Sequence, residues 1–324
     1  MTKVNRGVIL ASAAALVFAT GLGSTPSRAE FPEQPIEMTV MFGAGSAADV
    51  TARHLAEGIA KRLNVAVPVV NRTGAGGAAG LVHISQQKPN GYSIVWTSNQ
   101  MSTTYYSGQL PLAYDNFAPV ARVSVETPAL AVKADAPWKD LKEMLEYAKA
   151  NPEKVRIGNS GAGSHTHLSA AALFASVGAK TIDVPFQTGQ ATVNLLGGRI
   201  EGAVQLPAAF VSHVKSGDLR IIAVLGRERD PIFPDVPTAK EQGFDVQLDM
   251  WRGIAAPKDT PPEVVAKLQK AIEETVASPE FVEAGKTVGF RPAFLPAPDF
   301  GKLIASDDKK LGEVMSQLGM KKTQ

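Results

Sequence analysis

The sequence predicts an α/β protein built from two lobes, and three observations support this. The length of 324 residues suits two domains at about 100–200 residues each. With 44% hydrophobic and 20% charged residues, the composition is that of a globular chain that can bury a core. From Ile36 onward, short β-rich runs alternate with longer Ala-rich stretches, which is typical of βα units around a mostly parallel sheet. A second such run over 134–234 favours two lobes over one long sheet.

The elements are expected where runs of the right length and residue type are bounded by turn residues. The strand candidates, each short and rich in Val, Ile or Thr, are Glu37–Phe42, Val67–Asn71, Ser93–Thr97, Ala129–Lys133, Arg156–Gly158, Thr181–Val184, Gly202–Gln205, Ile221–Leu225 and Gly253–Pro257. The helix candidates, most of them longer and Ala-rich, are Ala47–Leu63, Gly77–Gln87, Trp138–Ala150, His167–Ser176, Gly189–Gly197, Ala208–Lys215, Ala239–Gln242, Pro262–Ala277, Pro279–Ala284 and Pro298–Leu318. The residues after 249 are mostly helical in this assignment, and we expect them to return to the first lobe.

The N-terminal residues 1–29 read as a secretory signal peptide. Lys3 and Arg6 precede the apolar run Val8–Leu22, and a small-x-small pattern ends at Ala29. The alternative is a membrane anchor, but the run is shorter than the roughly 20 apolar residues that span a bilayer. The segment holds three basic residues and no acid, so the remaining chain has 33 − 3 = 30 basic and 31 acidic residues, a net charge of −1. We expect export with cleavage near Ala29.

The composition excludes several classes of function. No cysteine is present, which excludes disulfide scaffolds, cysteine zinc sites and thiol catalysis. The charges form no basic stripe, so nucleic acid is not an expected partner. His165 and His167 lack the i, i+4 spacing of a zinc pair, and no G-x-S-x-G elbow occurs. We therefore expect no metal, no cofactor and no catalytic set, which favours a receptor over an enzyme.

A glycine-rich turn, Gly43 to Asp49, connects the first strand to the first helix. Such a turn aims free backbone N–H groups and the positive end of the helix dipole at one point, which suits a carboxylate or a phosphate. The spacing is neither that of a P-loop nor that of a dinucleotide site. The alternative is a tight turn in which Ser46 or Asp49 only caps the helix. The candidate ligand-binding residues here are Gly43, Gly45, Ser46 and Ala47.

Two further polar turns follow strands in the same way. One is Asn159 to His167, which leads into an Ala-rich helix, and the other is Thr97 to Thr104. Ligands of open α/β sheets bind at the carboxyl ends of strands, so we expect these turns to line a shared cleft. A fourth glycine-rich segment, Arg72 to Gly77, is expected only to turn the chain. The candidates from the two polar turns are Ser98, Asn99, Ser102, Ser160, Gly163, Ser164, His165 and Thr166.

Nine segments in order along the chain give a resemblance to a known family. They read FPEQPIEMTVMFGAGSAADVTARHLAEGIAKRL, VVNRTGAGGAAG, KPNGYSIVWTS, FAPVARV, GNSGAGSHTHLS, LLGGRIEG, HVKSGDLRIIAV, FPDVPTAKEQGFD and WRGIAAPKDTPPEVV. Together they resemble the periplasmic substrate-binding receptors of tripartite tricarboxylate transporters, also called the Bug receptor family. Each segment alone is unspecific, but nine in order are specific, and the resemblance runs from about Phe31 to Leu318.

The resemblance implies a two-lobed periplasmic-binding-protein fold of the type II kind, with a ligand cleft between the lobes. Mapped onto this chain, lobe 1 would be 30–127 plus 248–324 and lobe 2 would be 128–247. The family implies a small carboxylate ligand in the cleft, a location in the periplasm and delivery to membrane permease subunits. We expect a monomer.

Departures from the family pattern bear on the ligand. His165 stands where many relatives have a small residue or Pro, and it could donate to an anion, stack on a ring or only cap its helix. Gln205 stands where relatives often have Asp; it can donate as well as accept, although it could simply be a hydrogen-bonding residue at a strand end. Phe186 stands where relatives usually have Tyr, in the segment that continues through residues 187–190. It makes the cleft wall formed by this segment more apolar. The hypothesis is a dicarboxylate with an apolar or aromatic body, terephthalate being one candidate, and Gln205 argues against an amino acid.

Two charged residues are left with two roles each. Arg252 could clamp a carboxylate through two N–H groups or support the hinge where the chain crosses back to lobe 1. Asp49 is expected to orient its loop or complement the helix dipole, because a carboxylate beside a bound carboxylate would repel it. A secreted α/β enzyme acting on an anionic substrate and a ligand sensor for a signalling partner remain the rival functions.

Overall fold

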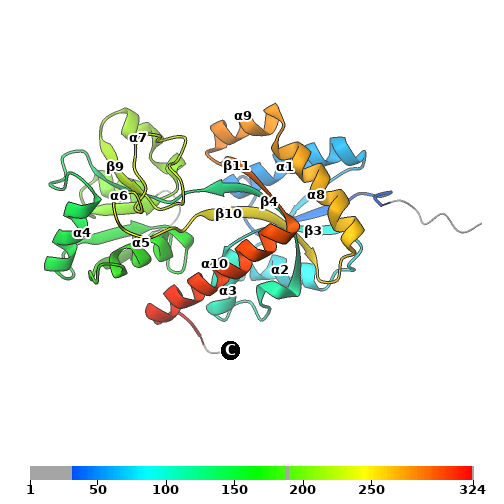
Figure 1. The fold of residues 1–324 in the computed structure, drawn as a ribbon, viewed down its shortest axis with the longest axis horizontal. Helices are drawn as coiled ribbons and strands as arrows, with labels where there is room; N and C mark the ends of the chain where they lie inside the picture. The colour runs from blue at the N-terminus through cyan, green and yellow to red at the C-terminus, as the bar shows by residue number, and fades with distance from the viewer. Residues whose placement is uncertain (1–30, 187–189, 323–324) are drawn as a thin grey trace, which may run out of the picture. The chain divides into compact units, whose positions relative to one another are not determined.

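Two mixed β-sheets, each covered by helices, make up the computed structural model of this chain, which describes residues 31–186 and 190–322 (Figure 1). Everything described here belongs to Phe31–Gln324, one of the two units into which the contacts divide the chain. The predicted signal peptide lies outside the described residues, as do residues 187–189 of the segment after Phe186.

The first sheet has six strands in the order β11-β4-β10-β3-β1-β2. Its strands are β1 (Glu37–Val40), β2 (Val69–Asn71), β3 (Ser93–Ser98), β4 (Phe117–Glu126), β10 (Met250–Pro257) and β11 (Arg291–Pro296). β1 pairs in parallel with β2 and β3, whereas β10 is antiparallel to β3 and β4, and β11 is antiparallel to β4. The C-terminal strands therefore complete the sheet that the N-terminal strands begin.

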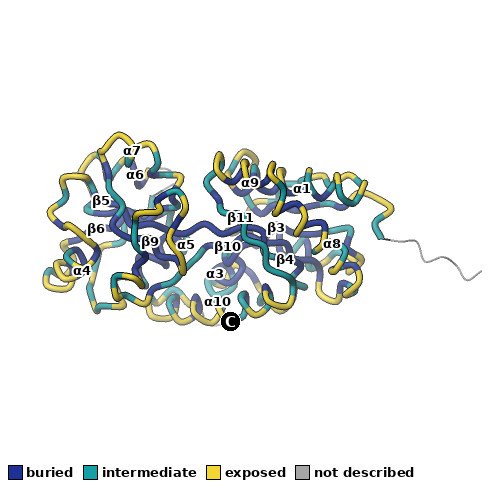
Figure 2. The backbone as a smooth tube through the Cα atoms, turned by 45° about the horizontal axis from the view of Figure 1, so that its top comes forward, coloured by how far each residue is buried: buried dark blue, intermediate teal, exposed yellow. Residues whose placement is uncertain are grey.

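The helices that accompany this sheet come from both ends of the chain. They are α1 (Ala47–Leu63), α2 (Ala78–Ser85), α3 (Gln100–Tyr106), α8 (Pro262–Val276), α9 (Pro279–Val288) and α10 (Ala297–Gln317), with 3-10 turns at Ala75–Gly77 and Tyr114–Asn116. All eight residues of β10 are buried (Figure 2). A central strand that is covered on both faces explains why its sequence, MWRGIAAP, is nearly continuous in apolar residues.

The second sheet has five strands in the order β7-β6-β8-β5-β9. Its strands are β5 (Ala129–Lys133), β6 (Arg156–Asn159), β7 (Ile182–Pro185), β8 (Gly202–Gln205) and β9 (Leu219–Val224). Its helices are α4 (Leu141–Ala150), α5 (His165–Ala175), α6 (Gln190–Leu196) and α7 (Val211–Lys215), with a 3-10 turn at Pro207–Ala209. β6 pairs in parallel with β7 and β8, and β5 is antiparallel to β8 and β9.

The predicted alternation of strands and helices is confirmed, and Ala47–Leu63, Ala129–Lys133 and Gly202–Gln205 have the predicted bounds. The expectation of mostly parallel sheets is wrong, because each sheet receives antiparallel strands from a crossing segment. The sequence reading missed β4 and β11. β11 carries two prolines, which lack the N–H that a ladder needs, and it lies at the sheet edge where prolines are tolerated.

Two other expectations require correction. The turn predicted over 97–104 is the end of β3 followed by helix α3, so its side chains follow a helical period. The helix predicted over Ala239–Gln242 is a turn: the N–H of Phe244 bonds back to the carbonyl of Ala239, and Gly243 adopts a positive φ of 92° that ends any helical run. The helix predicted over 189–197 corresponds to α6, which the structure describes from Gln190 onward. Residue 189 lies outside the described residues.

The chain crosses from one sheet to the other at two places, and a hydrogen bond links the two crossing segments. Thr127 and Pro128 connect β4 to β5, and Asp249 precedes β10. The Thr127 hydroxyl donates to Oδ1 of Asp249 at 3.0 Å. At Gly226 a Cβ would lie 2.4 Å from that same oxygen, so only glycine fits beside this bond. The crossings fit the lobe boundaries 30–127 plus 248–324 and 128–247, which we retain as a proposal.

Candidate functional site

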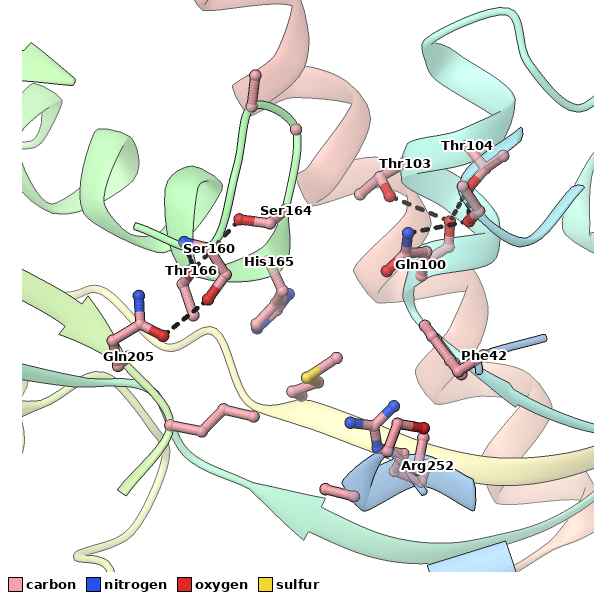
Figure 3. A pocket seen from close by; sticks show the side chains of 18 of the residues that line it. Phe42, Gln100, Thr103, Thr104, Ser160, Ser164, His165, Thr166, Gln205 and Arg252 are labelled. Carbon is pink, nitrogen blue, oxygen red and sulfur yellow. Dashed lines mark hydrogen bonds between the residues drawn. The ribbon is translucent and has the colours of Figure 1, made fainter. Parts of the chain in front are cut away.

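A cavity of about 640 Å³ lies where the two sheets' loops face each other, and residues from both sheets line it (Figure 3). The cavity wall contains both polar and apolar residues. The polar lining residues are Ser46, Gln100, Thr103, Thr104, Ser107, Gln109, Ser160, Ser164, His165, Thr166, Gln205 and Arg252. The others are Phe42, Ala47, Ala48, Gly76, Ala162, Gly163, Leu206, Ala208, Ala209, Met250 and Met320.

The loop before α1 is held by Asp49 from inside the helix. Ser46 caps the helix by accepting from the N–H of Asp49 at 3.2 Å, and one Asp49 oxygen accepts from the N–H of Gly45 at 2.9 Å. Arg53 and Asn71 donate to the same carboxylate at 3.0 and 2.8 Å. Burial raises the pKa of Asp49, but these hydrogen bonds outweigh it and the pKa is lowered. Asp49 therefore orients the loop and does not itself line the cavity.

The loop before α5 repeats this arrangement. Ser164 caps α5 by accepting from the N–H of His167 at 3.2 Å, and Thr166 accepts from the N–H of Ser160 at 2.9 Å. Gly161 and Gly163 adopt positive φ angles of 112° and 76°, which L side chains rarely allow. Both helices thus start at a serine cap beside the cavity, with the rest of each loop held by local hydrogen bonds.

The first residues of both helices lie at the cavity wall. Ala47 and Ala48 begin α1, and His165 and Thr166 begin α5; all four line the cavity. The first N–H groups of a helix have no intrahelical acceptor, and the serine caps satisfy only the third one. Four donors and the positive ends of two helix dipoles are therefore available to an anion.

His165 is fixed by the segment that leads to β10. Its Nε2 lies 2.8 Å from the carbonyl oxygen of Leu248. Burial lowers the pKa of His165, and the hydrogen bond to Leu248 opposes this only in part, so the neutral ring is favoured. Because a carbonyl only accepts, the single ring proton is on Nε2.

Arg252 lies in a buried ion pair next to the cavity. Its Nε and Nη2 each lie 3.2 Å from a different oxygen of Glu126, and both residues are only 5% exposed. The guanidinium carbon is 5.5 Å from the centroid of the Phe42 ring, within cation–π range. Of the two roles left open by the sequence, Arg252 takes a structural one through Glu126 and also reaches the cavity wall.

Eight of the thirteen sequence-predicted site residues line the cavity. They are Ser46, Ala47, Ser160, Gly163, Ser164, His165, Thr166 and Gln205. The other five, Gly43, Gly45, Ser98, Asn99 and Ser102, do not line it. Gly45 donates to Asp49, Ser98 accepts from the N–H of Gln100, and Asn99 donates to the carbonyl of Asp249, so their polar groups serve the loops behind the wall.

The segment 97–104 was expected to line the cleft, but the candidates chosen within it lie on the wrong face of α3 or precede it. Gln100, Thr103, Thr104 and Ser107 all line it, and they are spaced i, i+3, i+4 and i+7. That spacing places them on one helical face, whereas Ser102 falls on another and is buried. The polar period was present in the sequence and is the signal that identifies them.

Comparison with known proteins gives the family. The model of the tripartite tricarboxylate transporter family receptor matches residues 51–320. The chain belongs to this family. A TctC solute binding protein from Polaromonas superposes with a TM-score of 0.82 at 33% identity, over 89% of this chain and 99% of that chain. BugT from Bordetella pertussis is 28% identical over 98% of this chain and 99% of its own length.

A further relative was solved with its ligand. MatC from Rhodopseudomonas palustris, with bound malate, superposes with a TM-score of 0.69 at 26% identity, over 88% of this chain and 99% of that chain. The predicted two-lobed periplasmic-binding-protein fold is confirmed by these neighbours. Membership of a receptor family also confirms that the chain is a solute-binding receptor and not an enzyme.

Within residues 31–186 and 190–322, no group of three or more His, Asp or Glu side chains could hold a metal ion. In the same part of the chain, none of the helices has the length and apolar character needed to cross a bilayer.

Proposed function

We propose that the receptor is exported to the periplasm, captures a small carboxylate in the cavity and delivers it to the permease subunits of a tripartite tricarboxylate transporter. The observation that carries the proposal is the meeting of two helix starts at one cavity, because Ala47, Ala48, His165 and Thr166 line its wall and their N–H groups have no intrahelical acceptor. Backbone donors at helix N-termini bind carboxylates without a full positive charge. Export relies on the signal-peptide pattern of residues 1–29.

The charge of the cavity wall supports an anionic ligand. No Asp or Glu is among the described lining residues, and Asp49 is held behind the wall by Arg53 and Asn71. An anion entering the cavity therefore meets dipoles and hydroxyl groups and no facing carboxylate. The eight lining residues of the sequence prediction are proposed to contact the ligand, and Gly43, Gly45, Ser98, Asn99 and Ser102 to support them.

The apolar part of the wall bears on the body of the ligand. Phe42, Leu206, Met250 and Met320 lie between the polar groups, and the volume is within the range of small-molecule sites. A dicarboxylate with an apolar or aromatic body fits this division, and terephthalate is the carbon skeleton that we propose for it. The malate bound by MatC supports a dicarboxylate.

The test is binding without turnover. The chain from Glu30 onward is titrated by calorimetry and thermal shift with succinate, malate, phthalate, terephthalate and glutamate, and each ligand is then recovered and analysed. A receptor returns the ligand unchanged and gains thermal stability with ligand concentration. Chemical conversion of a bound carboxylate would refute the receptor role. Deleting the gene in the source organism separates delivery from sensing: loss of uptake supports delivery, and loss of induction alone supports a sensor.

Ser46 provides a variant that isolates the site. Ser46→Leu places a bulky apolar side chain at the first turn of α1, and we expect it to abolish carboxylate binding. Ser46→Gly is the matched control, because glycine at an N-cap costs the helix only a few tenths of a kcal/mol and leaves the N–H groups accessible. Calorimetry on both variants decides: unchanged affinity in Ser46→Leu would contradict the assignment.

A further inference from the structure

Three buried polar atoms of the cavity wall have no hydrogen-bond partner among the described residues. They are Nδ1 of His165, Nε2 of Gln205 and Nη1 of Arg252. The three residues are only 7%, 5% and 5% exposed, and all three line the cavity (Figure 3). Buried polar groups are almost always paired in folded proteins. Three such atoms at one cavity indicate groups that a ligand satisfies.

The atom on His165 accepts a hydrogen bond. Nε2 carries the ring proton because it lies 2.8 Å from the carbonyl oxygen of Leu248. In the neutral ring, Nδ1 therefore presents a lone pair. A carboxylate oxygen placed against this lone pair would be repelled, so the ligand atom that meets Nδ1 must bring a hydrogen.

The other two atoms donate. Oε1 of Gln205 accepts from the hydroxyl of Ser160 at 2.7 Å, which leaves the N–H groups of Nε2 for a ligand acceptor. Arg252 uses Nε and Nη2 on Glu126, which leaves Nη1. Both are suited to carboxylate oxygens.

We propose that the ligand is a hydroxylated carboxylate, whose hydroxyl group donates to Nδ1 of His165 while carboxylate oxygens accept from Gln205 and Arg252. This inference rests on the proposed function and names the substrate class within it. A hydroxyl group supplies the one donor that a plain dicarboxylate lacks, and it does so without a charge.

An ammonium group is the other common donor, and the wall does not provide for it. The described lining residues include no acid, and the nearby Glu126 is paired with Arg252. An ammonium group would share the cavity with a guanidinium and have no carboxylate to neutralise it. The donor that the wall accommodates is therefore neutral.

A second way to place a hydrogen at Nδ1 is to protonate His165 on binding. The charged groups that act on the ring are Asp249 and Glu126, which favour the charged form, and Arg252, which opposes it, while burial opposes it most strongly. This alternative is measurable, because it requires the protein to take up about one proton for each carboxylate bound.

The experiment uses ligand pairs that differ in one hydroxyl group. Succinate is compared with L-malate and D-malate, and terephthalate with 2-hydroxyterephthalate, by calorimetry in two buffers of different ionisation enthalpy. We expect the hydroxylated member of at least one pair to bind about tenfold more tightly, the gain typical of one hydrogen bond, without proton uptake.

Two variants locate the effect on one atom. The amide of His165→Gln can still donate to Leu248 but has no group at the position of Nδ1, so the preference for the hydroxylated ligand should vanish. The shorter amide of His165→Asn places a polar atom near Nδ1 and should keep part of the preference. A fall in the preference in both variants alike would assign it to a general disturbance and contradict the proposal.

The remaining outcomes are also decisive. Equal affinity within both pairs, a preference that persists in His165→Gln, or uptake of one proton with the hydroxylated ligand would each overturn the proposal. Failure of the proposed function has a different signature, because then no member of either pair binds at all.

Discussion

At the scale of single residues, the site depends on side chains that never reach the cavity. Asp49 receives hydrogen bonds from Gly45, Arg53 and Asn71, and in this way fixes the loop whose next residues line the wall. Glu126 does the same for Arg252. Removing either partner would leave a buried group unpaired, which is costlier than losing the bond alone.

Replacing Asp49 by Asn tests this role. Asn offers one acceptor atom where the carboxylate offers two, so we expect Asp49→Asn to lower the free energy of unfolding by about 1–3 kcal/mol at pH 7. The lost ion pair with Arg53 contributes little to this decrease in the free energy of unfolding, because Arg53 is half exposed and its attraction to Asp49 is screened by solvent. Urea unfolding of both proteins measures the difference.

The pH dependence of that difference follows from the lowered pKa of Asp49. A group whose pKa is lower in the folded state stabilises it above the ordinary pKa, and loses that contribution as the pH falls through the folded value. The difference between the wild type and Asp49→Asn should therefore be full at pH 6–7 and shrink below about pH 4. A difference that stays constant down to pH 3 would show that the carboxylate charge plays no part. The exposed Asp235→Asn is the control and should show no difference.

The sequence predicted those site residues whose signals are local. Ser46 and Ser164 could be found because a glycine-rich turn, a cap and an Ala-rich helix follow one another along the chain. The partner of Arg252 could not be found, since Glu126 is 126 residues away and only the antiparallel pairing of β4 with β10 brings them together. Met320 reaches the cavity from the end of the last helix, which no local pattern indicates.

At the scale of elements, α10 contacts segments that are far apart in the sequence. Its Leu311 and Met315 pack with Leu168 of α5, and Asp307 accepts from the indole N–H of Trp251 at 3.1 Å. Asp307 also pairs with Arg227 at 3.4 Å. Through these contacts the helix joins the first sheet to residues that accompany the second.

Gly312 of α10 tests this packing. A Cβ at Gly312 would lie 2.7 Å from Cζ of Tyr106, whose hydroxyl donates to Asp308 at 2.7 Å. We expect Gly312→Ala to cost about 1–3 kcal/mol through overpacking, more than the roughly 1 kcal/mol that Ala gains over Gly in a helix. Thermal and urea unfolding provide the measurement.

Gly301 on the same helix is the matched control. There a Cβ would meet only the Pro119 ring, at 3.3 Å, so the gain in helix propensity should offset the slight crowding and Gly301→Ala should be no less stable than the wild type. Equal stability of the two alanine variants would contradict the packing argument for Gly312.

At the scale of the whole molecule, the fold was predictable to the level of its class and of its two sheets, but not of their strand directions. The alternation of runs identifies βα units whatever their order in space. It does not reveal that β4, β10 and β11 insert antiparallel, because that follows from the chain crossing twice between the sheets. Contacts between residues far apart in the sequence, such as that between Thr127 and Asp249, accompany these crossings.

The proposed signal peptide gives a prediction at this scale. Protein produced without residues 1–29 should unfold at the same temperature as protein isolated from the periplasm, and the isolated form should begin at Glu30 by N-terminal mass spectrometry. With no cysteine in the sequence, a reducing agent should change neither value. An isolated protein that retains residues 1–29 would refute cleavage.

The end of the chain has a practical consequence for anyone who labels the receptor. The N–H of Lys322 bonds to the carbonyl of Tyr106 at 2.8 Å, and Met320, two residues earlier, is part of the cavity wall. We expect a purification tag or fluorescent reporter joined close to Lys322 to disturb the wall and to change the affinity for the ligand. The same connection makes the segment after α10 a suitable place to attach a dye when the aim is an optical sensor for the bound solute.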